Sequence, residues 1–161
     1  MRKIAIIFLF VFCNVVHSQN DALSKNTDGR KKDSVAAKTL NDLSWKAIYA
    51  GNYDSATYYI DISLKLSLKH DIKISISSCY NTLGSIAMQK GDLNQALDYY
   101  FLALKPLTAL KHKRGMAMVM SGIALTYSDK GDYPKAKSYT FQAMKLQEEL
   151  KDSLGIATSY N

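Results

Sequence analysis

The chain has 161 residues and a formal net charge of +7, with 21 lysines and arginines against 14 acidic residues. This length suits one domain of ordinary size. Nucleic-acid-binding proteins usually gather basic residues on one face and use the planar fork of arginine to bind phosphate. Arginine occurs here only at Arg2, Arg30 and Arg114, and the lysines are spread along the chain. The charge therefore indicates solvated helix faces, and we expect no nucleic-acid partner.

The first twenty residues, MRKIAIIFLFVFCNVVHSQN, have the pattern of a secretory signal peptide. A positive start precedes an apolar stretch over residues 4–13, which is shorter than the roughly 20 residues of a bilayer-spanning helix. Val16 and Ser18 suit the −3 and −1 positions of a signal peptidase, which places the cleavage between Ser18 and Gln19. We expect removal of residues 1–18 and export to the periplasm or another extracytoplasmic face of a bacterial envelope. The alternative is an uncleaved anchor.

Cleavage after Ser18 leaves Cys79 as the remaining cysteine, so no disulfide can form within the mature chain. Cys79 is expected to be a small buried residue rather than a reactive thiol. Cys13 lacks the Leu-x-small sequence that precedes a lipoprotein cysteine. Residues 19–33 are polar and show no period, which predicts a flexible leader. Order is expected to begin near Ser34, a suitable helix N-cap.

A phrase repeated at one fixed interval dominates the rest of the chain. It reads GNYDSATYYIDIS from Gly51, GDLNQALDYYFLA from Gly91 and GDYPKAKSYTFQA from Gly131. Glycine accepts the left-handed conformation that ends a helix, and the Asn or Asp that follows each glycine suits the N-cap of the next helix. Each phrase therefore predicts a turn followed by a second helix.

The residues before each phrase carry one apolar stripe with the helical spacing i, i+4, i+7, i+11. The three stripes are Ala36, Leu40, Leu43, Ala47; Ile76, Tyr80, Leu83, Ala87; and Met116, Met120, Ile123, Tyr127. Each unit is thus a predicted helical hairpin, and stacking of hairpins buries the stripes. The expected helices are 34–50, 53–69, 74–90, 93–111, 115–130 and 133–151. Pro106 is expected to kink or shorten the fourth of these helices.

The second unit resembles the tetratricopeptide repeat. The residues that carry the resemblance are Tyr80-x-x-Leu83-Gly84, then Gly91-Asp92-x-x-x-Ala96-x-x-x-Tyr100-x-x-Ala103. The period here is about 40 residues, rather than the roughly 34 residues usual in that family, and the other two units differ at two positions. These replacements are Ser44 and Ala124 for Gly84, and Ile60 and Thr140 for Tyr100.

The resemblance covers residues 34–161 and implies an all-α, right-handed superhelical solenoid. Its units are 34–73, 74–113 and 114–153, with a partial fourth unit at 154–161. Ile156 and Tyr160 lie one repeat period after Met116 and Met120. We therefore expect a fourth hairpin to open there, and the chain to be a fragment of a longer protein.

No residue pattern predicts a reaction. Glu148 and Glu149 are adjacent, so on a helix they point about 100° apart and cannot flank one substrate. His70 and His112 each follow Leu-Lys, and neither has a His or Cys cluster around it in the sequence. The chain also lacks a glycine-rich phosphate loop and a Gly-x-Ser-x-Gly elbow. We expect no catalytic site, no metal and no cofactor in these residues.

The resemblance implies a concave groove, lined by the first helix of each unit, that binds a peptide or protein segment. The positions that it assigns to the groove are Asn41, Trp45, Tyr49, Asn81, Ser85, Met88, Ser121, Leu125 and Ser128. Trp45 is the expected anchor, because it lies about 200° around the helix from the inward Leu43; the alternative is that Trp45 belongs to the core. Family members that grip a terminal carboxylate have asparagine at the position of Trp45, so we expect no carboxylate clamp.

Two functions remain open at this point. In the first, the chain is an exported, non-catalytic scaffold for protein interactions. In the second, it is the sensing region of an envelope signal-transduction protein. A signal peptide followed by such repeats is similar to the N-terminal regions of bacterial sensor histidine kinases and repeat-bearing transcriptional regulators. Their membrane span and output domain would lie beyond residue 161, and residues 19–161 are expected to make no membrane contact themselves.

Overall fold

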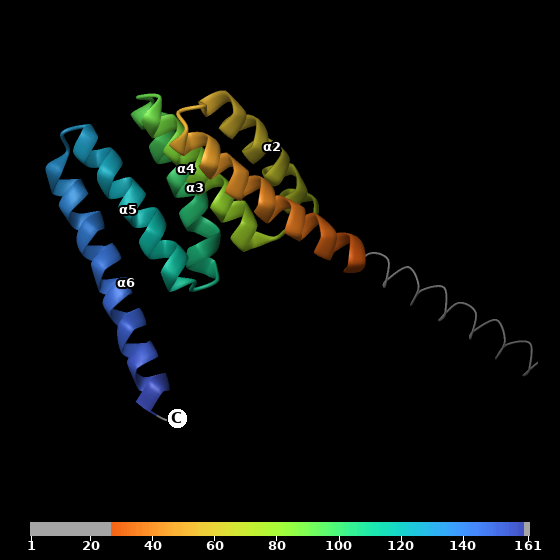
Figure 1. The fold of residues 1–161 in the computed structure, drawn as a ribbon. Helices are drawn as coiled ribbons and strands as arrows, with labels where there is room; N and C mark the ends of the chain where they lie inside the picture. The colour runs from red at the N-terminus through yellow and green to blue at the C-terminus, as the bar shows by residue number, and fades with distance from the viewer. Residues whose placement is uncertain (1–26, 160–161) are drawn as a thin grey trace, which may run out of the picture.

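The structure is a computed structural model that describes residues 27–159, with side chains as far as Lys151. Within this range the chain is helical, with no strand, and the helices follow one another as hairpins placed side by side (Figure 1). The helices are 27–49, α2 (Tyr53–Lys69), α3 (Lys73–Gln89), α4 (Leu93–Ala109), α5 (Lys113–Asp129) and α6 (Tyr133–Ser159). The predicted signal peptide and residues 19–26 of the expected leader lie outside the described residues.

The turn inside each hairpin is made by a left-handed glycine, as predicted. Gly51, Gly91 and Gly131 have φ values of 73°, 83° and 77°. In the first hairpin the N–H of Gly51 donates to Ile48 O at 2.9 Å, and the N–H of Asn52 donates to Ala47 O at 2.8 Å. This pair of bonds satisfies the last carbonyls of the helix 27–49 in a Schellman motif.

The turns between hairpins use the same motif without glycine. Asp71 and Lys111, which occupy equivalent positions in successive units, have φ values of 51° and 53°. A side chain in this conformation costs about 1–2 kcal/mol, and the packing of the next helix must offset that cost.

The next residue in this register is Lys151, and α6 continues through it to Ser159. The expected helix end near residue 151 is therefore wrong, and no separate helix begins at residue 154 in the described part. Among the described residues no helix follows α6 to pack against it, so no such packing offsets the cost of a positive φ at Lys151.

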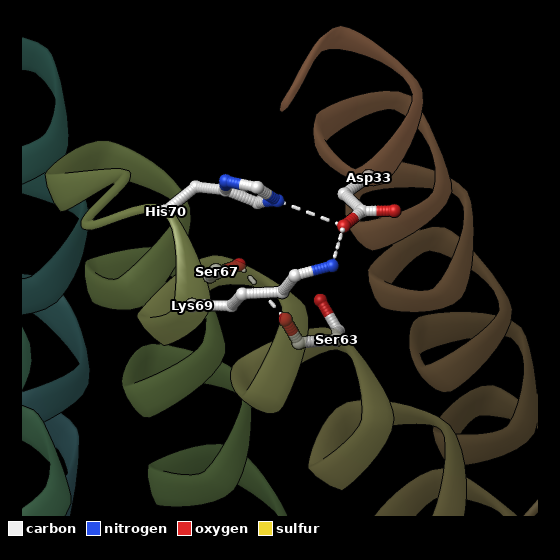
Figure 2. A network of polar contacts seen from close by, with 5 residues as sticks. All are labelled: Asp33, Ser63, Ser67, Lys69 and His70. Atoms are coloured by element: carbon white, nitrogen blue, oxygen red, sulfur yellow. Dashed lines mark hydrogen bonds and ion pairs between the residues drawn. The ribbon is translucent and has the colours of Figure 1, made fainter. Parts of the chain in front are cut away.

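The start of the first helix also differs from the prediction. The helix includes residues 27–33, so order begins before Ser34. Asp33 explains the difference, because its Oδ2 lies 2.8 Å from both Lys69 Nζ and His70 Nε2 at the end of α2 (Figure 2). This contact between helices could not be found from the local sequence, which is polar and without period.

The hairpins stack into an all-α solenoid, which confirms the predicted fold class. Helix α3 contacts α2, α4 and α5, and α5 contacts α4 and α6. The helix 27–49 is joined to α2 by two buried serines: Ser44 Oγ donates to Ala56 O at 2.8 Å, and Ser63 Oγ donates to Ala37 O at 2.7 Å. First helices of successive units are therefore neighbours, and so are successive hairpins.

The core lies between the hairpins, and the predicted stripes form only part of it. In the second unit Ile76, Leu83 and Ala87 are buried, whereas in the first unit all four stripe residues are half-buried and Ala37 and Ser44 are buried instead. The repeated alanines Ala56 and Ala96 are fully buried, and Ala136 is 9% exposed. Half-buried tyrosines pack beside them: the rings of Tyr80 and Tyr99 stack with centroids 6.4 Å apart. Small residues let the helices approach, and the aromatic rings fill the space beside the contact.

Pro106 does not shorten α4. The helix continues to Ala109 and has 17 residues, as do α2, α3 and α5. The missing N–H of Pro106 removes a single bond in the last turn, while its carbonyl still accepts from the N–H of Leu110 at 3.0 Å. The early stop expected from the sequence is therefore not observed.

Candidate interaction surface

The nine predicted groove residues lie on three neighbouring helices: 27–49, α3 and α5. The structure divides them into two groups. Some are committed to contacts within the fold, and others leave their side chains exposed to solvent.

Asn41 belongs to the first group, because it joins the first unit to the second. It is 8% exposed, its Oδ1 accepts from Thr82 Oγ1 at 2.9 Å, and its Nδ2 donates to Ser78 Oγ. Both polar ends of the carboxamide are therefore bound to α3. The primary role of Asn41 is to connect two helices.

Asn81 is the equivalent of Asn41 in the second unit and is also buried, at 5% exposure. The residues one repeat period after Ser78 and Thr82 are Met118 and Gly122, which have no hydroxyl. The connection that Asn41 makes is therefore not repeated between α3 and α5.

Ser85 and Met88 also contact the interior. Ser85 Oγ lies 3.1 Å from the hydroxyl of Tyr100, which is 2% exposed. Burial raises the pKa of the Tyr100 phenol, and the hydrogen bond with Ser85 lowers it in part. Met88 packs against the core, and its Sδ accepts from Thr126 Oγ1 at 3.5 Å. Neither residue presents a free polar group.

The exposed group is mainly aromatic and aliphatic. Tyr49 is 84% exposed and Leu125 is 51% exposed, and Met118, on α5 with Leu125, is 54% exposed. Trp45 is half-buried, and its ring lies 6.0 Å from that of Tyr49 at a tilt of 34°. Among the remaining predicted positions, Ser121 is exposed and Ser128 is half-buried.

Two of the three helices carry almost no charge. Helix α3 has no charged residue between Lys73 and Lys90, and α5 has none between Arg114 and Asp129. Exposed apolar side chains on an uncharged helix favour a partner that is bound by apolar contact and hydrogen bonds rather than by ion pairing.

A hollow of about 1100 Å³ lies beside Met118, between the first half of α5 and residues 147–151 of α6. Its lining residues are His112, Arg114, Gly115, Ala117, Met118, Ser121, Gln147, Leu150 and Lys151. Met118 and Ser121 are groove positions that the resemblance implies, and Met118 lies off the inward stripe that contains Met116 and Met120. Which other residues line the hollow depends on how α6 packs against α5, and the repeat pattern alone does not specify that packing.

The polar cluster in Figure 2 contains the residue types of a hydrolase triad, but its hydroxyls are directed elsewhere. Ser67 Oγ donates to Ser63 O at 2.8 Å, and Ser63 Oγ donates to a backbone carbonyl of the first helix. Hydrogen bonds from Lys69, and secondarily from His70, hold the pKa of the Asp33 carboxyl below its usual range. The arrangement fastens the first helix to the end of α2.

Cys79 is fully buried in the same region, as expected from the sequence, and its Sγ lies 3.2 Å from Ser63 Oγ. Burial raises the pKa of the thiol, which disfavours the reactive thiolate. In the described part of the chain, no group of three or more His, Cys, Asp or Glu side chains could hold a metal ion. The helices described there also include none with the length and apolar character of a membrane span.

No protein-family model and no curated protein sequence matches the chain. Solved structures do match it. The TPR domain of Arabidopsis FLU aligns with 74% of this chain and 98% of its own, at 17% identity and a TM-score of 0.65. BtubC (BKLC) from P. vanneervenii aligns with 71% of this chain at 19% identity and a TM-score of 0.64, and the match spans 48% of the BtubC chain. At these identities the likeness concerns the fold, and the chain has a fold like that of tetratricopeptide repeat domains.

Proposed function

We propose that the chain is a non-catalytic scaffold that binds a peptide or protein segment across the helices 27–49, α3 and α5. The observation that carries the proposal is the exposure of Tyr49 at the end of the helix 27–49, together with that of Met118 and Leu125 on α5, which has no charged residue between Arg114 and Asp129. Tyrosine is a frequent binding hot spot, and exposed apolar side chains that lie together mark interaction sites. Asn41 and Ser85 support the surface from within instead of contacting the partner.

The test compares variants of the proposed surface with a matched residue elsewhere. Tyr49→Ala and Leu125→Ser remove apolar area from the surface, whereas Tyr58→Ala removes a tyrosine that is 64% exposed on α2. Residues 19–161 carrying an affinity tag would be used to capture partners from an envelope extract. The first two variants should lose the captured protein and Tyr58→Ala should retain it, with melting temperatures close to the parent. Equal capture by all three variants would exclude this surface.

Trp45 gives a second readout with a purified partner, because it is the single tryptophan of the chain and adjoins Tyr49. Binding across the helix 27–49 should shift its fluorescence, and Tyr49→Ala should weaken the titration. A partner that binds with full affinity and leaves Trp45 fluorescence unchanged would place the contact on another face.

We also propose that the chain is exported and forms the N-terminal part of a larger envelope protein. The support for export is the charged and then apolar order of residues 1–18. N-terminal sequencing of the mature protein from its native envelope should begin at Gln19. A protein that retains Met1 would contradict cleavage, and an uncleaved anchor would then replace this part of the proposal.

A further inference from the structure

The outer face of α6 carries an exposed stripe that the repeat function does not use. Lys137, Phe141, Met144 and Glu148 follow one another at i, i+4, i+7 and i+11, so they lie along one side of the helix. Phe141 is 68% exposed and Met144 is 51% exposed, and both border a hollow of about 560 Å³ on this face. We call these four residues the α6 stripe.

The equivalent stripe of the second unit is partly covered by the third. Leu97, the equivalent of Lys137, is 8% exposed, and Leu104, the equivalent of Met144, packs against the core cluster. The ring of Phe101, the equivalent of Phe141, lies 6.3 Å from that of Tyr139. In the third unit α6 continues to Ser159 without a turn, so no element among the described residues folds back over the α6 stripe.

The α6 stripe is complementary to itself when reversed. If two α6 helices run antiparallel, a two-fold axis midway between residues 142 and 143 places Phe141 of each opposite Met144 of the other. The same axis places Lys137 opposite Glu148, since both pairs are centred on the same point of the helix. Neither Lys137 nor Glu148 has an ion-pair partner within residues 27–151. A second copy of the chain therefore offers both apolar cover and opposite charge.

We propose that the chain forms a two-fold symmetric dimer through antiparallel pairing of the α6 stripes. The apolar pair at the centre supplies the burial, because exposed Phe and Met side chains are removed from water. The two charge pairs at the ends fix the antiparallel orientation and disfavour the parallel one, in which like charges meet. Such an interface is isologous and closes at two copies, so it does not propagate into a filament.

The decisive experiment reverses the charges one at a time. Lys137→Glu places two glutamates opposite each other in each pair, and Glu148→Lys places two lysines opposite each other. Sedimentation equilibrium on residues 19–161 should show dimers for the parent, and each single variant should have a dimerisation constant weakened by at least about ten-fold. An equimolar mixture of the two variants should recover the dimer. In the mixed dimer the two introduced side chains face each other with opposite charge, and the native Lys137 of one copy faces the native Glu148 of the other.

Two controls separate this pairing from other associations. Phe141→Asp should abolish the dimer without changing the circular dichroism spectrum, and Lys65→Glu, at an exposed position of α2, should leave the dimer intact. A parent protein that stays monomeric up to hundreds of micromolar would overturn the proposal. A dimer that ignores both charge reversals, or single variants that stay monomeric when mixed, would overturn it equally. These results do not depend on capture of a partner by the helices 27–49, α3 and α5.

Discussion

A Cβ atom placed on Gly122 would lie 2.8 Å from Cε1 of the Tyr100 ring, and one placed on Gly84 would lie 2.7 Å from the same atom. Tyr100 therefore occupies a space between α3 and α5 that exists because both helices lack a side chain there. The ring is 2% exposed and cannot move aside. This contact explains why the first and third units differ from the second: Ile60 and Thr140 replace the tyrosine, and Ser44 and Ala124 replace Gly84.

Gly122→Ala should destabilise the protein by about 1–3 kcal/mol, the usual range for an overpacked core. The direction of this change in the free energy of unfolding is informative, because alanine in place of glycine inside a helix otherwise stabilises by about 0.5–1 kcal/mol. Urea unfolding of residues 19–161 measures the difference. In a Tyr100→Leu background the same substitution should be neutral or stabilising, and an equal loss in both backgrounds would show that Tyr100 is not the obstacle.

At the left-handed turns between hairpins we expect substitutions to stabilise the protein rather than destabilise it. Lys111→Gly should raise the free energy of unfolding by up to about 1 kcal/mol, because glycine removes the steric cost of a positive φ. Asp71→Gly should gain less, since aspartate tolerates this conformation better and Asp71 also pairs with Lys73 at 2.6 Å. Thermal and urea unfolding of both variants would show which gains more stability. A larger gain for Asp71→Gly than for Lys111→Gly would contradict the prediction.

The contact between Asp33 and the end of α2 predicts a dependence on pH. The pKa of Asp33 is lowered in the folded protein, mainly by the hydrogen bond from Lys69. The stabilisation is therefore present above the unfolded pKa, about 3.9 for aspartate, and is lost as the pH falls through the lower folded value. Asp33→Asn should lower the melting temperature at pH 7, and the difference from the parent should disappear in acid.

Amide hydrogen exchange provides the local readout for this contact. At pH 7 the Asp33→Asn variant should exchange faster in residues 27–36, because the first turns of the helix lose their attachment to α2. Asp42→Asn, at an exposed position of the same helix, is the matched control and should leave this region unchanged. Equal protection in the two variants would show that the attachment does not hold these turns.

Repetition explains which features were predictable from the sequence. Gly51, Gly91 and Gly131 recur at one position, and a helix end followed by a left-handed glycine is a local property of the chain. The buried alanines Ala56, Ala96 and Ala136 were predictable for the same reason, because they recur at one position of the repeated phrase. The start of the first helix was not predictable from the local sequence, since Asp33 is held there by Lys69 and His70, far along the chain.

The candidate surface was predicted only in part, and Asn41 shows why. Helical geometry places Asn41 and Tyr49 on one side of a helix, but it does not say how much of that side the next unit covers. The structure shows that α3 covers Asn41, while Tyr49, two turns further on, remains exposed. Sequence spacing thus identifies a helix face, and the stacking of the following hairpin decides which residues of it are left for a partner.

Asn41 and Asn81, both buried, allow these roles to be separated. Asn41→Ala should destabilise the protein by about 1–3 kcal/mol, because it leaves the hydroxyls of Ser78 and Thr82 without their partner in the first unit. Asn81→Ala should cost less, since Met118 and Gly122 offer no equivalent hydroxyls on α5. Urea unfolding gives both values, and a double variant Asn41→Ala with Thr82→Val should be less destabilised than the two single losses added together. Strict additivity would mean that Asn41 and Thr82 are not coupled.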